Sequence, residues 1–302
     1  MDKKEFFAQL RRQKWSYIFI SVPFLLFFIF QLAPVFISFL WSFTEYDVVH
    51  PPKFIGLDNY INIFTNDPLF RKSVINTIIY VVGVVPLGVC LSLVLAVAID
   101  QKIKFKNFFK SIFFLPTVTA IVAVSVIWKW LYAGEKYGLF NYLIMKLGFQ
   151  PVDWLASPIW TLPSIMIMSI WAGLGYSMIL FLAGLQTIPQ VMYEMAEIDG
   201  AGFWCKLFHV TLPLLKPTIV FVSMMSFIFS FQVFEQVYVM TGGDGAIGGV
   251  LNSALTMVAY LYDKGFTKFQ MGYASALAYI IFFCVFIFTM LNKRLIKSRV
   301  EY

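Results

Sequence analysis

Residues Thr187–Pro217 read TIPQVMYEMAEIDGAGFWCKLFHVTLPLLKP, and this polar run lies between two long apolar segments. Three carboxylates fall close together in it, on Glu194, Glu197 and Asp199. The sequence on either side has the composition of a lipid-facing protein. A polar, glycine-punctuated stretch between apolar segments is expected to lie outside the lipid, and the rest of the chain is interpreted around it.

The composition indicates a membrane protein. Of the 302 residues, 60% are hydrophobic and 13% are charged, whereas soluble domains average about 25% charged residues. This balance predicts a polytopic membrane protein. The net charge of +7 is attributed to lysine and arginine in cytoplasmic loops, not to a nucleic-acid partner. Cys90, Cys205 and Cys284 fall in two apolar spans and in the polar run, so no disulfide is expected.

Six apolar runs are long enough to cross a bilayer core of about 30 Å as helices, at about 1.5 Å per residue. Lipid cannot satisfy free backbone groups, so each run is predicted to be helical. The six spans are residues 15–40, 73–99, 111–131, 159–185, 218–240 and 271–291. The expected fold is therefore all-α, a polytopic membrane protein with six transmembrane helices. A helical pattern also occurs in the loop at residues 140–147.

The first span is too long for a signal-peptide core, so it is predicted to be retained. Three regions are expected: an N-terminal segment (1–72) holding the first span and an external loop, a core (73–291), and a basic cytoplasmic tail (292–302).

The loop charges predict the orientation. One side of the six-span arrangement carries the larger set of cations: Lys3, Lys4, Arg11, Arg12, Lys14, Lys102, Lys104, Lys106, Lys110, Lys206, Lys216, Lys293, Arg294, Lys297 and Arg299. The other side carries the smaller set: Lys53, Arg71, Lys72, Lys136, Lys146, Lys264 and Lys268. Both termini and the 187–217 run are therefore expected in the cytoplasm, which an even number of spans also requires.

A short amphipathic helix is predicted in the first half of the run. Val191, Met195 and Ile198 are spaced i, i+4 and i+7, which places them on one helical face. Glu194 and Glu197 fall on a different face. A helix lying on lipid would carry lysine there, since anionic lipid repels carboxylates. The acidic face therefore favours a protein partner with a groove that carries a basic side chain.

Glycine and proline mark the ends of this helix. Pro189 suits its first turn, and Gly200 and Gly202 are expected to end it. A second short helix follows, which Pro213 is expected to break, and Pro217 is expected to open the next span.

The spacing from Glu194 to Pro213 resembles a known signature. Glu194-Met195-Ala196, three residues, Gly200, nine residues and then VTLP match the "EAA" motif of ABC importer permeases, with Met195 and Val210 in place of alanine and isoleucine. The runs GLDNY (56–60), FFLPTVTAIVAVSVIWKWLY (113–132), TGG (241–243) and GYASALAYI (272–280) extend the similarity. The chain therefore resembles the carbohydrate-uptake branch of the MetI-like superfamily, the maltose and glycerol-phosphate type permeases.

The resemblance implies that the run is a coupling helix seated in a cleft of a cytoplasmic ATPase. The implied partners are a second homologous permease, two ATPase subunits, an extracellular solute-binding protein, a sugar and membrane lipid, with no nucleic acid. The candidate coupling residues are Glu194, Met195, Ala196, Ile198, Asp199 and Gly200. Met195 and Ile198 come from the helical face described above. No catalytic residue, metal or cofactor is expected.

Five candidate substrate contacts are named: Tyr176, Ser226, Phe229, Ser230 and Glu235. Ser226, Phe229 and Ser230 lie in the fifth span at positions that resemble a pore-lining set of the sugar branch. Tyr176 belongs to the run WAGLGYS (171–177) of the fourth span, where it is a candidate to face the cavity. Sugars need hydroxyl partners and an aromatic face for their C–H surface. The alternative is that the small residues let helices approach closely and that Phe229 serves packing. Glu235 is included because a carboxylate at membrane depth is costly and is by default functional.

Other functions are disfavoured but weighed. The run TGGDGAIGG lacks the Lys-Ser/Thr of a phosphate loop, so energy is expected from a partner. A secondary transporter would place paired charges in several spans. A permease of the same superfamily for a non-sugar solute, such as glycerol phosphate, is the remaining alternative.

Overall fold

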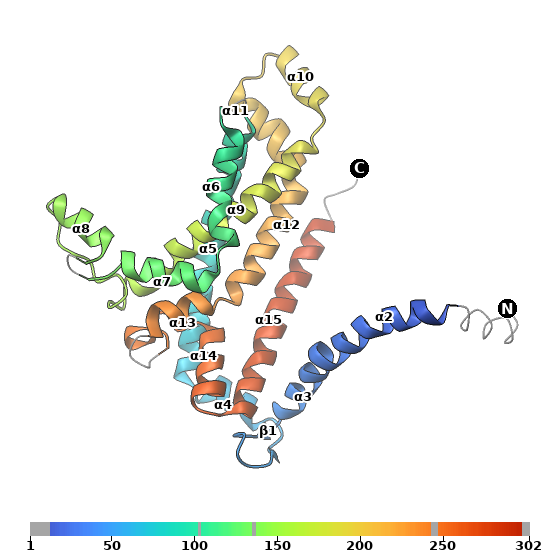
Figure 1. Cartoon of the computed structure of the whole chain (residues 1–302), viewed down its shortest axis with the longest axis vertical. Coiled ribbons are helices and arrows are strands. Elements are labelled where there is room, and N and C mark those ends of the chain that lie inside the picture. Colours follow the sequence, from blue (N-terminus) through green and yellow to red (C-terminus); the bar gives the residue numbers. More distant parts are fainter. Residues whose placement is uncertain (1–12, 102–103, 135–136, 243–246, 298–302) are drawn as a thin grey trace, which may run out of the picture. The chain divides into compact units, whose positions relative to one another are not determined.

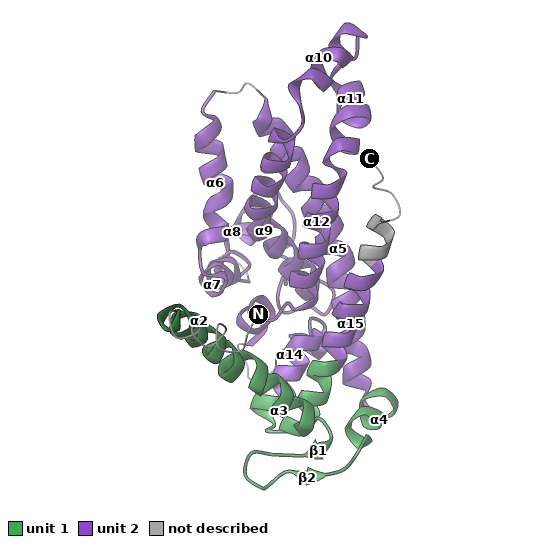
Figure 2. Cartoon of the chain, turned by 90° about the vertical axis from the view of Figure 1, so that its right-hand side faces the viewer, with its two compact units in different colours: residues 1–65, 264–279 green, residues 66–263, 280–302 purple. Residues whose placement is uncertain are grey.

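Helices account for nearly all of the apolar sequence in the computed structural model (Figure 1). The structure describes residues 13–101, 104–134, 137–242 and 247–297, with side chains as far as residue 291. The basic residues from Lys3 to Arg12, Lys102, Lys136 and the side chains of the predicted tail lie outside these ranges. The chain divides into two compact units, one of residues up to 65 with 264–279, the other of 66–263 with residues from 280 onward (Figure 2).

The first unit begins with one long apolar helix and ends with the start of α15. Its elements are α2 (Lys14–Phe27), the π-helical turn η1 (Phe28–Leu32), α3 (Ala33–Trp41), β1 (Thr44–Glu45), β2 (Lys53–Phe54), α4 (Asp58–Thr65) and the first turns of α15 (Met271–Lys297). The strands pair antiparallel, with Thr44 opposite Phe54. The π turn directly precedes the helical turn that contains Pro34, whose ring removes a backbone donor.

Two of the motifs that carry the family resemblance have structural roles in this unit. Within GLDNY, the buried Asn59 side chain donates to the carbonyls of Ser42 and Thr44, each at 2.9 Å. In GYASALAYI, a Cβ on Gly272 would overlap the Thr44 carbonyl oxygen, so only glycine permits this approach. Both motifs therefore hold the chain around the β1–β2 hairpin.

The second unit contains the remaining helices. They are α5 (Pro68–Asp100), α6 (Lys106–Val118), α7 (Ile121–Leu131), α8 (Leu139–Lys146), α9 (Thr161–Gln186), α10 (Gln190–Ile198), α11 (Phe203–Lys206), the π turn η2 (Leu207–Thr211), α12 (Leu212–Phe231), α13 (Glu235–Thr241), the 3-10 turn η4 (Val250–Asn252) and α14 (Met257–Tyr262). A further π turn, η5 (Asp263–Thr267), leads back into the first unit.

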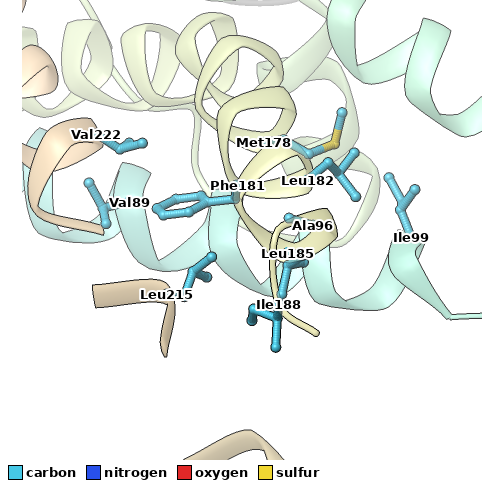
Figure 3. Packing of buried hydrophobic residues seen from close by; sticks show 10 residues of the cluster. All are labelled: Val89, Ala96, Ile99, Met178, Phe181, Leu182, Leu185, Ile188, Leu215 and Val222. Carbon is cyan, nitrogen blue, oxygen red and sulfur yellow. The ribbon is translucent and has the colours of Figure 1, made fainter. Parts of the chain in front are cut away.

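The core of the second unit is formed where α5, α9 and α12 pack side by side (Figures 1 and 3). Ten buried apolar side chains meet there: Val89, Ala96, Ile99, Met178, Phe181, Leu182, Leu185, Ile188, Leu215 and Val222. α5 starts where it does because Asp67 caps it, with Oδ1 accepting from the backbone N–H groups of Leu69 and Phe70 at 3.0 Å.

The predicted fold class is confirmed, and the spans differ in detail. Five helices are long and apolar enough to cross a membrane, and the pair α6–α7 makes six if it is counted as one span. The helical pattern predicted at 140–147 is α8.

The third span is not the straight helix predicted over 111–131. α6 and α7 meet at an angle of 98°, because Thr119 and Ala120 have extended backbone. Pro116 has already removed one helical donor. The Thr119 hydroxyl donates to the Leu115 carbonyl at 3.0 Å and so replaces a helical bond at the break.

The fifth span was also placed incorrectly. It starts earlier than residue 218, because α11, η2 and α12 form one continuous helix over Phe203–Phe231. Pro213 lies two residues beyond the π turn η2, and Pro217 lies one turn further along; neither ends the helix. The span ends at Phe231, not at residue 240, and α13 follows a three-residue break.

Replacing Gly175 by alanine is expected to destabilise the protein by roughly 1–3 kcal/mol, as overpacking does. The new methyl would overlap the Phe113 carbonyl on α6, and backbone cannot move aside as a side chain can. Thermal unfolding in detergent measures the effect. Gly173→Ala is the matched control on the same helix, because its methyl meets no atom within 4 Å. Equal unfolding temperatures for the two variants would contradict the close approach of α6 and α9.

Candidate functional site

The exposed surface of α10 is the first part of the site. Val191, Met195 and Ile198 are all exposed, with 86% of Ile198 accessible. Glu194 on the same helix is exposed as well. Within the described part of the chain, no other element covers this apolar stripe beside a carboxylate. α10 lies at one end of the second unit, and α13 and α14 lie at the other (Figure 1).

A glycine turn closes α10. Gly200 has φ +77°, a left-handed conformation that glycine adopts without strain. The N–H of Ala201 bonds to the Ala196 carbonyl at 2.8 Å, and the N–H of Gly200 bonds to the Glu197 carbonyl at 3.0 Å. These two bonds form a Schellman motif, which satisfies the last carbonyls of the helix. The chain direction after α10 is therefore fixed by backbone bonds.

Two side-chain contacts tie α10 to the helix that follows. The Tyr193 hydroxyl lies 3.2 Å from Thr211 Oγ1 on η2. Lys206 Nζ on α11 donates to Glu197 Oε1 at 2.8 Å. Tyr193 also packs against the buried core of α5, α9 and α12. These contacts hold the side of α10 that faces α11, η2 and the core, and the opposite side of α10 is exposed.

The structure brings the six candidate coupling residues together on α10 and its terminal turn. Glu194, Met195, Ile198, Asp199 and Gly200 are exposed, and Ala196 is half-buried. Ala196 contributes its backbone carbonyl to the glycine turn, where it accepts from the N–H of Ala201.

The second part of the site is a cavity of about 410 Å³ within the second unit. Helices α5, α6, α7, α9, α12 and α13 all contribute to its wall. Its lining includes three aromatic rings, a set of small polar side chains and one amide: Tyr80, Tyr176, Phe229, Thr117, Thr119, Ser169, Ser177, Ser226, Ser230 and Gln236. The volume lies within the range of small-molecule pockets, about 300–1,000 Å³.

Four of the five candidate substrate contacts line this cavity. Tyr176 comes from α9, and Ser226, Phe229 and Ser230 come from α12. Glu235 does not line it: this residue is exposed in the first turn of α13, and its neighbour Gln236 reaches the wall instead.

The cavity wall carries no charge among the described residues. None of its lining side chains is aspartate, glutamate, lysine, arginine or histidine. Hydroxyls and an amide provide hydrogen-bond donors and acceptors, and the rings provide apolar faces. This combination suits a neutral, hydroxyl-rich molecule with a C–H face, and it disfavours a buried ion, whose transfer from water is costly.

Several wall residues were not predicted from the sequence. Thr117 and Thr119 belong to the run FFLPTVTA, which carried only a family resemblance, and they reach the cavity because the chain bends there. Tyr80 lies in an apolar run with no periodic signal. The proline followed by two threonines is the one local feature that could have indicated a bend. Lys129 Nζ on α7 donates to the Val239 carbonyl at 3.3 Å and so joins α7 to α13.

One helix joins the two parts of the site. The continuous helix Phe203–Phe231 begins beside α10 and carries Ser226, Phe229 and Ser230 at its far end. At about 1.5 Å per residue, Thr211 and Ser226 are about 22 Å apart along it. The exposed α10 surface and the cavity are therefore connected by a stiff element.

Comparison with known proteins gives a consistent family. A family model described as "Binding-protein-dependent transport system inner membrane component" matches residues 69–301. The "Probable ABC transporter permease protein YesP" of Bacillus subtilis (strain 168) is 36% identical, over 91% of this chain and 88% of that protein. The "Arabinooligosaccharides transport system permease protein AraP" of the same organism is 33% identical, over 93% and 88%.

The fold is also found among solved structures. A chain in the crystal structure of a bacterial ABC transporter involved in the import of the acidic polysaccharide alginate matches with a TM-score of 0.86. The two chains are 21% identical, and the match covers 98% of this chain and 100% of the other. At this identity the likeness concerns the fold alone.

A cysteine placed at Ser226 is expected to react with a small, charged, water-soluble thiol reagent, because thiolate forms only where water enters. Phe221→Cys on the same helix is the matched control: Phe221 is exposed but does not line the cavity, so it is expected to face lipid and stay unlabelled. Both variants are made after replacement of Cys90, Cys205 and Cys284. Labelling at residue 221 but not at 226 would contradict a water-filled cavity on this face of α12.

Proposed function

The chain belongs to the family of binding-protein-dependent transport system inner membrane components, and we propose that it is the permease subunit of an ATP-driven importer for an oligosaccharide. It is a multi-pass membrane protein with several apolar helices. Its substrate is delivered by an extracellular binding protein, and its energy comes from ATPase subunits on the other side of the membrane.

The observation that carries this proposal is the continuity between α10 and the cavity wall. α10 exposes an apolar stripe beside a carboxylate, and a glycine turn fixes its end. It lies beside the start of the helix Phe203–Phe231, whose other end lines a cavity large enough for a solute. A protein that grips α10 and moves it can act on the cavity through this helix.

The proposed assembly is a heterodimer of this chain with a second homologous permease, served by two ATPases. Glu194, Met195 and Ile198 enter a cleft of one ATPase, and Asp199, Gly200 and Ala196 form the turn that presents them. We propose that this chain has no ATPase site of its own, since its sequence holds no Gly-Lys-Ser/Thr run of the phosphate-loop type.

The orientation follows from the cations. Lys104, Lys106, Lys110, Lys206 and Lys216 lie in or near the loops on the α10 side. We therefore place α10 and both termini in the cytoplasm. The family match begins at residue 69, which supports a core permease domain over residues 73–291. The match itself runs on to residue 301, and we propose 1–72 as an N-terminal segment and 292–302 as a basic tail.

The substrate is proposed to be a neutral oligosaccharide because of the cavity wall and one relative. AraP is named for arabinooligosaccharides and shares 33% of its residues with this chain. Ser226 and Ser230 offer hydroxyls, and Tyr176 and Phe229 offer rings for the sugar's C–H face. Glu235, exposed at the start of α13, is proposed as a contact near the outer end of the path.

Reconstitution tests the function directly. The full complex of both permeases and the ATPases is placed in liposomes with the binding protein outside and ATP inside, and accumulation of labelled arabinooligosaccharide is measured. Uptake that requires both ATP and the binding protein is expected. Uptake that persists without ATPase subunits would instead indicate a secondary transporter, and uptake of glycerol phosphate alone would indicate the non-sugar branch.

Met195→Asp and Glu194→Lys are expected to reduce uptake at least ten-fold while the permease remains in the membrane. The first places a charge in an apolar contact and the second reverses the charge facing the ATPase groove. Uptake is measured at verified protein levels. Gln150→Lys, the same charge introduced at an exposed residue after α8, is the control and is expected to leave uptake unchanged. Unaltered uptake in both α10 variants would remove the coupling role of this helix.

A further inference from the structure

The contacts between α10 and the helix after it form a closed ring. Tyr193 on α10 reaches Thr211 on η2 at 3.2 Å, and Thr211 Oγ1 lies 3.3 Å from the Lys206 carbonyl, to which it donates. Lys206 Nζ returns to Glu197 on α10 at 2.8 Å. Tyr193 and Glu197 are one helical turn apart, so α10 is held at two points and not at one.

Two points of attachment restrict α10 in a way that one does not. A single contact would leave the helix free to pivot about it. The glycine turn at Gly200 fixes the chain direction at one end of α10, and the ring fixes the rotation of α10 about its own axis. Surface ion pairs contribute little to stability by themselves, so the ring is better explained by stiffness than by folding energy.

The ring closes on a part of the next helix that is firmly packed. Thr211 is 5% exposed, and Leu215 one turn later is 1% exposed within the core of α5, α9 and α12 (Figure 3). From there the helix continues without interruption to Ser226 and Phe229 on the cavity wall. A displacement of α10 therefore acts on the buried part of the helix Phe203–Phe231 and not on a loop.

The π turn explains why Thr211 can take part. η2 (Leu207–Thr211) lies between α11 and α12, and its wider backbone lets the Thr211 hydroxyl reach the carbonyl five residues back. Such turns inside α-helices are frequently found at functional positions. A regular helix would offer that hydroxyl a carbonyl three or four residues back, as Thr65 and Thr289 show elsewhere in the chain.

We propose that Tyr193, Glu197, Lys206 and Thr211 are positioning residues that lock α10 to the foot of α12, so that motion of α10 reaches the cavity. This inference rests on the proposed function, in which α10 binds the ATPase. The four residues do not form the surface that binds the ATPase. Without them the ATPase still binds α10, but α10 pivots or slides, and the motion of the ATPase does not reach α12.

Transport per ATP hydrolysed, measured with the whole complex in liposomes, tests the proposal. Tyr193→Phe removes only the hydroxyl and keeps the ring that packs in the core, and Thr211→Val removes the partner. Each is expected to retain the ATPase on co-purification and to hydrolyse ATP, while sugar moved per ATP falls at least five-fold. Tyr142→Phe, an exposed tyrosine on α8, is the control with no change expected.

Charge reversal provides a readout that a loss of folding would not give. Glu197→Lys and Lys206→Glu alone are each expected to lower transport per ATP, and the double reversal is expected to restore at least half of it. An unchanged ratio in Tyr193→Phe and Thr211→Val, or a double reversal no better than the single variants, would overturn the proposal.

The failure of the proposed function is distinguishable from the failure of this inference. If Met195→Asp leaves the ATPase bound and transport intact, α10 is not the docking helix and both ideas fall. If Met195→Asp releases the ATPase while the four ring variants keep a normal ratio of transport to ATP, only the ring is wrong.

Discussion

The structure depends on one constraint: inside a bilayer every backbone N–H and C=O must find its partner within the protein. Unbroken helices meet it automatically, so each interruption needs a compensating group. At the bend between α6 and α7, the Thr119 hydroxyl serves the Leu115 carbonyl. At the break after α12, the Thr256 hydroxyl serves the Val233 carbonyl at 3.0 Å. Both interruptions border residues of the cavity wall, so irregular backbone occurs where a polar cavity can tolerate it.

Glycine on α9 sets how closely the other helices approach it. Gly175 faces the backbone of α6, and Gly184 faces Leu215 and Thr218 of α12. Neither neighbour could lie as close to a larger residue, and small residues play this role at helix interfaces in membranes. Because α9 is packed so tightly on both sides, α6, α9 and α12 are expected to move as a group. α10 is attached to that group by its contacts with η2 and α11, and the group contributes part of the cavity wall.

The fold class and the family could be predicted from the sequence because their signals are local. The length of the apolar runs indicates the spans, and the spacing from Glu194 to Pro213 indicates the family. The coupling role of residues 187–217 stays a prediction. Ser226, Phe229 and Ser230 were placed correctly on one wall because they share one helix. The 98° bend was missed, since Pro116 is compatible with a straight span and only the packing of α6 on α9 decides against it. The ring through Tyr193 and Thr211 was missed because it depends on a π turn that the sequence marks only by Pro213, two residues beyond it, as Pro34 lies two residues beyond η1.

The uncharged wall of the cavity has a consequence for the energetics of the whole cycle. Moving one elementary charge through a membrane potential of 100 mV costs or yields about 2.3 kcal/mol. Since no described residue on the wall is ionised, rearranging that wall transfers no charge across the field, and a neutral solute adds none. Rearrangement of the wall residues should therefore add no voltage dependence of its own to the transport cycle.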